Sequence, residues 1–421
     1  DSAEKRKVCL RQLQVLRAEE RQRLEEEKAR RAEQDAEERQ RLEEEKARRA
    51  EQDARVREIE ARQKAVFEAK KEAERQQKLQ LLAEKRKKLA PAKGLICVRA
   101  GQPWAVQQDG TVVPSSNNTA DLKNIVAIAL SGGSIGLRAD GTLITSKHSV
   151  YKPCWPEYND FVAIAGDEVW LALRSNGTVR ASDEKIRGVA QWTEIVDIAV
   201  AGKVCLGLRA DGTVLMAGGF GNQKNHIENW TDIVSIAAKA NCIAGLKADG
   251  TVLFDKNGEM IDTSVLADIV SISVSSTHLL GLTLNGTVEA VSVHTGTLGI
   301  SREDLMCQVG DWNDIVAIGA QYRYSMGVKA DGTVVFASEK DRRLKEELEA
   351  MKDWKLFDSL DVLVQARETM RDKMLGKRAA LNDETQSLQR ELANLKGLFS
   401  GGKRRQLEVR LAQIEEELKN I

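Results

Sequence analysis

The chain has 421 residues, 64 basic and 64 acidic side chains, and six cysteines. A membrane-spanning helix is excluded, because no run of about eighteen apolar residues occurs. The cysteines stand singly, without a Cys-x-x-Cys pair, so zinc and redox motifs find no support and a reducing, cytoplasmic compartment is favoured.

Residues 1–91 form a charged N-terminal arm in which the block RQRLEEEKARRAEQDA occurs twice, at 21–36 and 39–54. A period of eighteen is five turns of about 3.6 residues, which predicts one straight helix. Pairs such as Glu26 with Arg30 are four residues apart and support a solvated single helix of about 130 Å. A coiled-coil dimer and a disordered charge run are the alternatives. The apolar residues that favour a dimer are Leu10, Leu13, Leu16, Val56, Ile59, Val66 and Phe67.

Residues 94–360 contain a turn signal that occurs seven times. The copies read QQDGTVV, RADGTLI, RSNGTVR, RADGTVL, KADGTVL, TLNGTVE and KADGTVV. Asp-Gly or Asn-Gly between apolar runs predicts a β-hairpin, since both central positions of the turn need positive φ. The glycines are about 31 to 46 residues apart, which is the spacing of propeller blades.

A second apolar run precedes each hairpin, such as EIVDIA from Glu194 and DIVSIA from Asp232, and several follow a tryptophan, as with Trp192 and Trp230. Each unit thus has three strands, and such a unit must stack on its neighbours to bury both faces. The sequence predicts a closed ring of seven sheets, with KLFDS after Trp354 returning to complete the first. The repeated tryptophans are assigned to the core between blades.

The combination W-x-D-I-V-x-I-A followed by G-L-x-A-D-G-T-V resembles the regulator of chromosome condensation repeat in its compact bacterial form. The resemblance covers about residues 94–360 and implies a seven-bladed β-propeller. The short blades are similar in architecture to those of the β-lactamase inhibitory protein of the same superfamily, which is a binding protein. The resemblance also implies an alternative function, guanine-nucleotide exchange on a small GTPase.

Residues 361–421 form a C-terminal arm. Leu388, Leu392 and Leu395, then Leu411 and Ile414 beyond an SGGKRR segment, have heptad-like spacing, which predicts an antiparallel helical hairpin. A further short charged helix is expected at about residues 340–351. The overall fold class is therefore mainly β, a propeller between a long charged helix and a helical hairpin.

No catalytic or ligand-binding pattern stands out. The four histidines never lie at metal-ligand spacing, and one carboxylate per turn cannot supply the six or more oxygens that calcium needs. We therefore expect no enzyme activity, no cofactor and no metal. The acidic excess of the central region argues against specific nucleic-acid binding.

The sequence favours a non-enzymatic protein-interaction or scaffolding role, in which the propeller binds a protein partner and the arms space or dimerise it. Trp104 and Trp170 lie outside the repeated tryptophan position and are expected to be exposed contacts. The hairpin tip combines apolar and basic residues, which indicates either contact with an acidic partner or anionic membrane, or simple helix capping. The tip residues singled out are Phe399, Lys403, Arg404 and Arg405.

Overall fold

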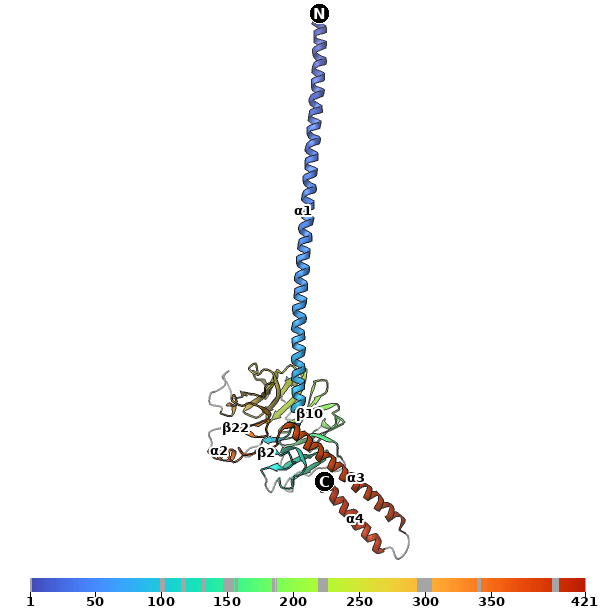
Figure 1. Cartoon of the computed structure of the whole chain (residues 1–421), viewed down its shortest axis with the longest axis vertical. Helices are drawn as coiled ribbons and strands as arrows, with labels where there is room; N and C mark the ends of the chain where they lie inside the picture. The colour runs from blue at the N-terminus through green and yellow to red at the C-terminus, as the bar shows by residue number, and fades with distance from the viewer. Residues whose placement is uncertain are drawn as a thin grey trace. The chain divides into compact units, whose positions relative to one another are not determined.

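The computed structural model of the chain describes residues 2–98, 103–114, 119–130, 133–146, 155, 158–183, 186, 188–218, 226–293, 305–338, 342–395 and 401–420. Helix α1 (Ser2–Leu89) confirms the predicted N-terminal helix and is drawn as one unbroken coil in Figure 1. Its Glu-first pairs form ion pairs, for example Arg31 with Glu27 at 2.8 Å and Arg49 with Glu45 at 2.7 Å. Strong helix formers and these pairs explain why a helix with so few apolar residues forms.

Contacts divide the chain into two units, one ending at Gln77 and the other beginning at Lys78. The last turns of α1 thus pack with the propeller, although the sequence placed the boundary near Pro91. Leu82 is fully buried and Leu89 is 7% exposed, both in the same apolar cluster as the seventh sheet. A short 3-10 turn, η1 (Ala90–Ala92), with Pro91 near its start, ends the helix.

The described residues contain seven separate antiparallel sheets, and the chain is a seven-bladed β-propeller. Within each sheet the strands follow chain order, and we number the blades 1 to 7 along the chain. The strands of blades 1 to 4 are β1 (Ile96–Val98), β2 (Pro103–Val106), β3 (Val112–Val113), β4 (Ile125–Leu130), β5 (Ser134–Arg138), β6 (Leu143–Thr145), β7 (Phe161–Gly166), β8 (Trp170–Arg174), β9 (Val179–Ala181), β10 (Ile195–Ala201), β11 (Val204–Arg209) and β12 (Val214–Ala217). Those of blades 5 to 7 are β13 (Ile233–Lys239), β14 (Cys242–Lys247), β15 (Val252–Lys256), β16 (Glu259–Met260), β17 (Ile269–Val274), β18 (His278–Thr283), β19 (Val288–Ser292), β20 (Ile315–Gln321), β21 (Tyr324–Lys329) and β22 (Val334–Ser338).

The repeated Asp-Gly turns hold each hairpin and join it to the next blade. In blade 4, Asp211 Oδ1 accepts hydrogen bonds from the Thr213 backbone N–H at 2.9 Å and from its hydroxyl at 2.6 Å. Gly212 has a φ of 84°, and its carbonyl accepts from the N–H of Ile233, the first residue of blade 5. Glycine therefore serves both the turn conformation and the close approach of the next strand.

The repeated tryptophans lie between blades, as predicted. Trp192, Trp230 and Trp312 are only 7%, 4% and 6% exposed. A Cβ added to Gly245 would approach ring carbon Cε3 of Trp230 to 2.8 Å, so the glycine in the second strand makes room for the indole. This pairing explains why W-x-D-I-V and G-L occur together in the repeat.

The C-terminal return closes the ring between blades 7 and 1. The Leu356 N–H donates to Gly332 O at 2.8 Å, and Leu356 O accepts from Gln108 N at 2.7 Å. Leu356 thereby takes the place that the first residue of an inner strand has in the other blades, and Thr333 bridges Lys355. The predicted closure by the KLFDS segment is confirmed.

Three further helices follow blade 7. Helix α2 (Arg342–Glu349) lays Leu344 and Leu348 over Tyr324, whose pKa is raised by burial. Helix α3 (Leu360–Asn394) begins at Ser359, whose hydroxyl caps the Val362 N–H, and helix α4 (Gly401–Asn420) returns beside it as a hairpin (Figure 1). The predicted hairpin is confirmed. Other 3-10 turns are η2 (Val189–Gln191), η3 (His226–Asn229) and η4 (Leu305–Cys307).

Candidate partner-binding surface

A valine stands at the same place in the first strand of blades 2 to 7. In each of these strands the pairing register shifts across this valine, as between Ile195 and Asp197 in β10, so the valine is a bulge residue. First strands of successive blades are neighbours around the ring, which makes them the innermost strands. The bulge therefore presents a ring of valines around one end of the propeller axis. They are Val126, Val162, Val196, Val234, Val270 and Val316.

The end of α1 covers this ring at blades 6 and 7 and reaches the turn of blade 5. Arg86 donates to Ala248 O and Lys247 O at 3.0 Å each and to Ile269 O at 3.3 Å, and Lys78 pairs with Asp268 at 2.5 Å. Burial lowers the pKa of Arg86 in this position.

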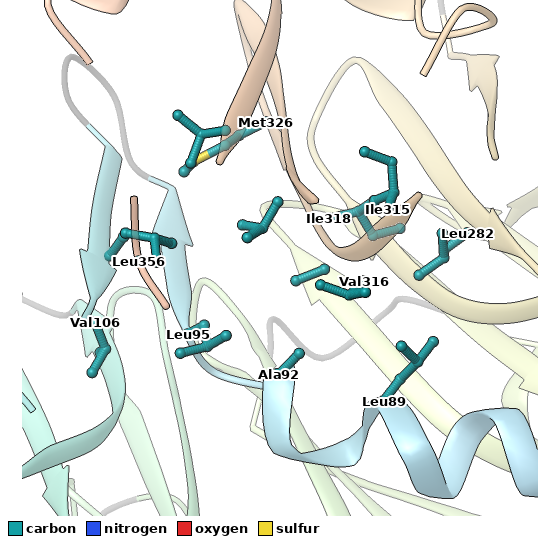
Figure 2. Packing of buried hydrophobic residues seen from close by; sticks show 14 of the residues in the cluster. Leu89, Ala92, Leu95, Val106, Leu282, Ile315, Val316, Ile318, Met326 and Leu356 are labelled. Carbon is teal, nitrogen blue, oxygen red and sulfur yellow. The ribbon is translucent and has the colours of Figure 1, made fainter. Parts of the chain in front are cut away.

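Beneath these polar contacts, Leu82 and Leu89 share one buried cluster with Val270 and Val316, which are 4% and 7% exposed. Figure 2 shows part of this cluster, with Leu89 and Ala92 lying across from Val316.

Helix α3 covers the ring at blade 2. Arg367 donates to Val126 O and to Pro91 O, each at 2.5 Å, and so ties α3 to both the ring and η1. Burial lowers the pKa of Arg367 to about 10. About three helical turns further along α3, Arg378 pairs with the fully buried Asp140 carboxylate of the blade 2 turn at 2.9 Å.

Blades 3 to 5 leave their valines uncovered. Val162 and Val196 are 55% exposed and Val234 is 40% exposed. We call these three residues the open sector. Glu194 and Asp232, which precede the first strands of blades 4 and 5, are also exposed and have left-handed φ values of 60° and 61°. The open sector is thus an apolar strip beside acidic side chains.

A lysine from the covering segment lies at the inner side of the open sector. Lys93 Nζ is 2.6 Å from Asp197 Oδ1, and the other oxygen of this buried carboxylate accepts from the Ser235 hydroxyl at 3.0 Å. Because Lys93 is 61% exposed, it adds a cation at this end of the propeller axis. The pair fixes the chain after η1 against blade 4.

At the other end of the propeller axis, one carboxylate connects the inner strands of three blades. Asp167, after β7, accepts from Gly202 N at 2.9 Å and Ala240 N at 3.3 Å, and Lys239 lies 3.4 Å from its other oxygen. One carboxylate therefore spans blades 3, 4 and 5, which is a structural task that the repeat pattern did not reveal.

The residues singled out from the sequence do not form one site. Lys403 pairs with Glu391 at 2.6 Å and Arg404 with Glu408 at 3.2 Å, both within the hairpin, while Arg405 is exposed. Phe399 lies outside the described residues.

The two tryptophans lie in different blades. Trp104 is half-buried in β2 of blade 1 and packs on the main core cluster. Trp170, in β8 of blade 3, is only 1% exposed, and its ring centroid lies 5.1 Å from that of Trp155. The expectation that Trp170 is exposed is therefore wrong, because aromatic packing within blade 3 buries it.

Sequence reasoning missed the open sector. The first strands of blades 2 to 7 all carry the same valine, so the repeat gives no sign of which copies stay exposed. The difference comes from α1 and α3, which are distant in sequence and cover only part of the ring.

The described residues contain no cluster of three or more His, Cys, Asp or Glu side chains arranged to hold a metal ion. None of the helices in the described ranges has the length and hydropathy needed to cross a membrane.

No family model and no curated protein matches this sequence. Similar solved structures include Prp20p from Saccharomyces cerevisiae, at 14% identity over 60% of this chain and 84% of that one, with a TM-score of 0.37. The ectodomain of the Physcomitrella patens receptor kinase CR4 has 13% identity over 58% and 69% of the two chains, with a TM-score of 0.39. The designed protein Ika8 has 16% identity over 58% and 82%, with a TM-score of 0.37. Yeast RCC1 (Prp20) has also been solved with Kap60 bound.

Proposed function

We propose that this chain is a non-enzymatic interaction protein whose propeller binds a protein partner at the open sector. The observation that carries the proposal is the unequal covering of one ring of equivalent valines. Where α1 covers the ring, Val270 and Val316 are nearly inaccessible, while Val162 and Val196 are 55% exposed. Contiguous apolar surface with a polar border is typical of protein-interaction sites.

The first experiment compares partners of the full chain with those of a Val196→Glu/Val234→Glu variant. A carboxylate in place of each valine removes apolar contact area and adds a charge that a docked partner would desolvate. Val265→Glu is the matched control, because Val265 is 58% exposed outside the open sector.

All three proteins are first checked for similar thermal midpoints. Quantitative affinity enrichment should then show partners that the wild type and the control retain and that are depleted at least tenfold with the double variant. Identical partner profiles for all three would overturn the proposal.

We further propose that α1 either spaces the propeller from another body or dimerises it. Leu24 and Leu42, at equivalent places in the repeated block, are both 52% exposed within α1. Mass photometry of the full chain beside a chain lacking residues 1–77 distinguishes the two roles. The cut at 77 keeps the turns of α1 that pack on blades 5 to 7. A dimer that becomes a monomer on truncation indicates an oligomerisation role, and monomers in both cases indicate a spacer.

Guanine-nucleotide exchange stays the alternative function. It predicts faster release of labelled guanine nucleotide from a GTPase in the presence of the propeller. This alternative rests on the sequence resemblance alone.

A further inference from the structure

The contacts between the last turns of α1 and the propeller indicate which kind of ligand fits the open sector. Along α1, Lys78, Leu82, Arg86 and Leu89 are four, four and three residues apart, so they share one helix face. Each contacts a different part of the repeat. Lys78 meets the acidic residue before a first strand, Arg86 meets backbone carbonyls, and the leucines share a buried cluster with the bulge valines.

The same set of acceptors exists two blades earlier in the ring. Asp268, Ile269 and Val270 of blade 6 correspond to Glu194, Ile195 and Val196 of blade 4. Lys247 and Ala248, whose carbonyls receive Arg86, correspond to Arg174 and Ser175 in the turn of blade 3. The second valine of the covered site is Val316 of blade 7. Two blades earlier, it corresponds to Val234 of blade 5. The acid that meets Lys78, the carbonyls and both apolar contacts thus have counterparts two blades earlier, whereas Asp249, the acid near Arg86, corresponds to Asn176.

The backbone geometry of the two places agrees. Asp268 has a φ of 57° and Glu194 a φ of 60°, so their side chains leave the chain from the same conformation. The turn carbonyls have the same internal bond in both places, with Gly250 N donating to Lys247 O at 3.1 Å and Gly177 N donating to Arg174 O at 3.0 Å. The difference is occupancy: within the described part of the chain, no basic side chain forms an ion pair with Glu194, and Val196 is 55% exposed.

We propose that the open sector binds a basic amphipathic α-helix of a protein partner, in the register that Lys78–Leu89 uses on blades 5 to 7. This inference rests on the proposed function and names the class of partner. The partner helix carries a basic residue that pairs with Glu194, a leucine or similar residue one turn later against Val196 and Val234, and an arginine two turns later for the Arg174 and Ser175 carbonyls. Charge complementarity fixes the direction of the helix, and the valines supply the apolar contact.

The test uses the full chain and a fluorescein-labelled synthetic peptide with the sequence of residues 71–90, which contains the docking face. Binding is measured by fluorescence anisotropy. We expect saturable binding that weakens at least tenfold with Val196→Glu and with Glu194→Lys. A peptide in which the lysine corresponding to Lys78 is replaced by Glu should lose affinity for the wild type and regain it with Glu194→Lys. This charge exchange tests the register as well as the location.

Asp268→Lys is the matched control, because Asp268 receives the chain's own Lys78. If the peptide merely displaces the resident helix, Asp268→Lys will weaken binding and Glu194→Lys will not, and the inference is overturned. No binding of the peptide by the wild-type chain also overturns it. In that case depletion of a cellular partner by Val196→Glu/Val234→Glu still supports the proposed function, so the two failures are distinguishable.

Discussion

At the scale of single residues, the side chains of the turn aspartates accept hydrogen bonds that hold the turn. Asp211 and Asp331 each accept from the hydroxyl and the N–H of the threonine two residues later. Hydrogen bonding from the Thr213 and Thr333 side chains, the largest cause, and then from their backbone lowers the pKa of the two aspartates. Blade 3 has Asn176 in this place and makes the same two bonds without a titrating group.

The first prediction concerns acid stability. A carboxyl whose folded pKa is depressed stabilises the fold above its unfolded pKa of about 3.9, and this contribution is lost as the pH falls through the folded pKa. Between about pH 5 and about pH 3, the thermal unfolding midpoint of an Asp211→Asn/Asp331→Asn variant should therefore fall less than that of the wild type. The converse change, Asn176→Asp, should steepen the acid dependence. Equal slopes for all three proteins in calorimetry would contradict the prediction.

The second prediction concerns the cysteines. Burial raises the pKa of Cys205 to about 12 and that of Cys242 to about 11, whereas Cys9 is exposed on α1. Since only the thiolate reacts, iodoacetamide at about pH 8 should label Cys9 more than about a hundredfold faster than either buried thiol. Peptide mapping by mass spectrometry over time measures the rates. Labelling in denaturant provides the control, in which the three rates should become similar.

Residue-level prediction from sequence worked where the repeat imposed the answer. Trp230 and the turn glycines could be placed because their pattern occurs many times. Trp170 was misassigned because a single tryptophan outside the repeat has no pattern, and its burial depends on Trp155 and Phe161 of the same blade.

At the scale of elements, the helical hairpin is held by an apolar seam and an ionic network. Ile414 of α4 is fully buried with Met374 and Leu381 of α3. Arg410 donates to Glu384 at 2.7 and 3.0 Å and to Glu417 at 2.9 Å, and these hydrogen bonds raise its pKa.

The third prediction is that Ile414→Ala loosens α4 from α3. Truncating a fully buried isoleucine costs about 2 to 5 kcal/mol, which is a large share of the stability of a two-helix element. Limited proteolysis should cut the variant within 401–420 at least tenfold faster than the wild type. Val409→Ala, at a side chain that is 51% exposed, is the control and should be cut at the wild-type rate. Protection of the Ile414→Ala hairpin would show that the ionic network alone holds it.

The existence and order of the elements followed from the sequence, because turn signals and apolar periodicity are local. The role of the last turns of α1 did not. Lys78, Leu82 and Arg86 lie where leucines become more frequent in the arm, but the contacts of Lys78 and Arg86 are with Asp268 and Ala248, far along the chain. No local pattern reports such a partner.

At the scale of the whole molecule, closure of the ring depends on a short returning segment. Leu356 is 1% exposed and Phe357 is 2% exposed, and both join the cluster that contains blades 1 and 7. The backbone bonds of Leu356 to Gly332 and Gln108 replace the continuous strand that the other blades have.

The fourth prediction is that Leu356→Asp destabilises the entire propeller. Loss of a buried leucine together with burial of an unpaired charge should reduce the free energy of unfolding by about 3 kcal/mol or more. Leu356→Met conserves volume and should cost less than about 1.5 kcal/mol. Urea titration followed by tryptophan fluorescence measures both. A Leu356→Asp variant with the midpoint of the wild type would mean that the returning segment does not hold the ring.

This closure has a consequence during synthesis. Blade 1 is the first to leave the ribosome, yet Leu356, which completes it, follows about 260 residues after Leu95. At about 5 to 20 residues per second, that interval lasts on the order of ten to fifty seconds. Throughout it blade 1 of the nascent chain lacks its neighbour across the closed ring and exposes the strands that later pack on blade 7. We therefore expect the emerging polypeptide to depend on chaperones that bind exposed strands until its last blade has been translated.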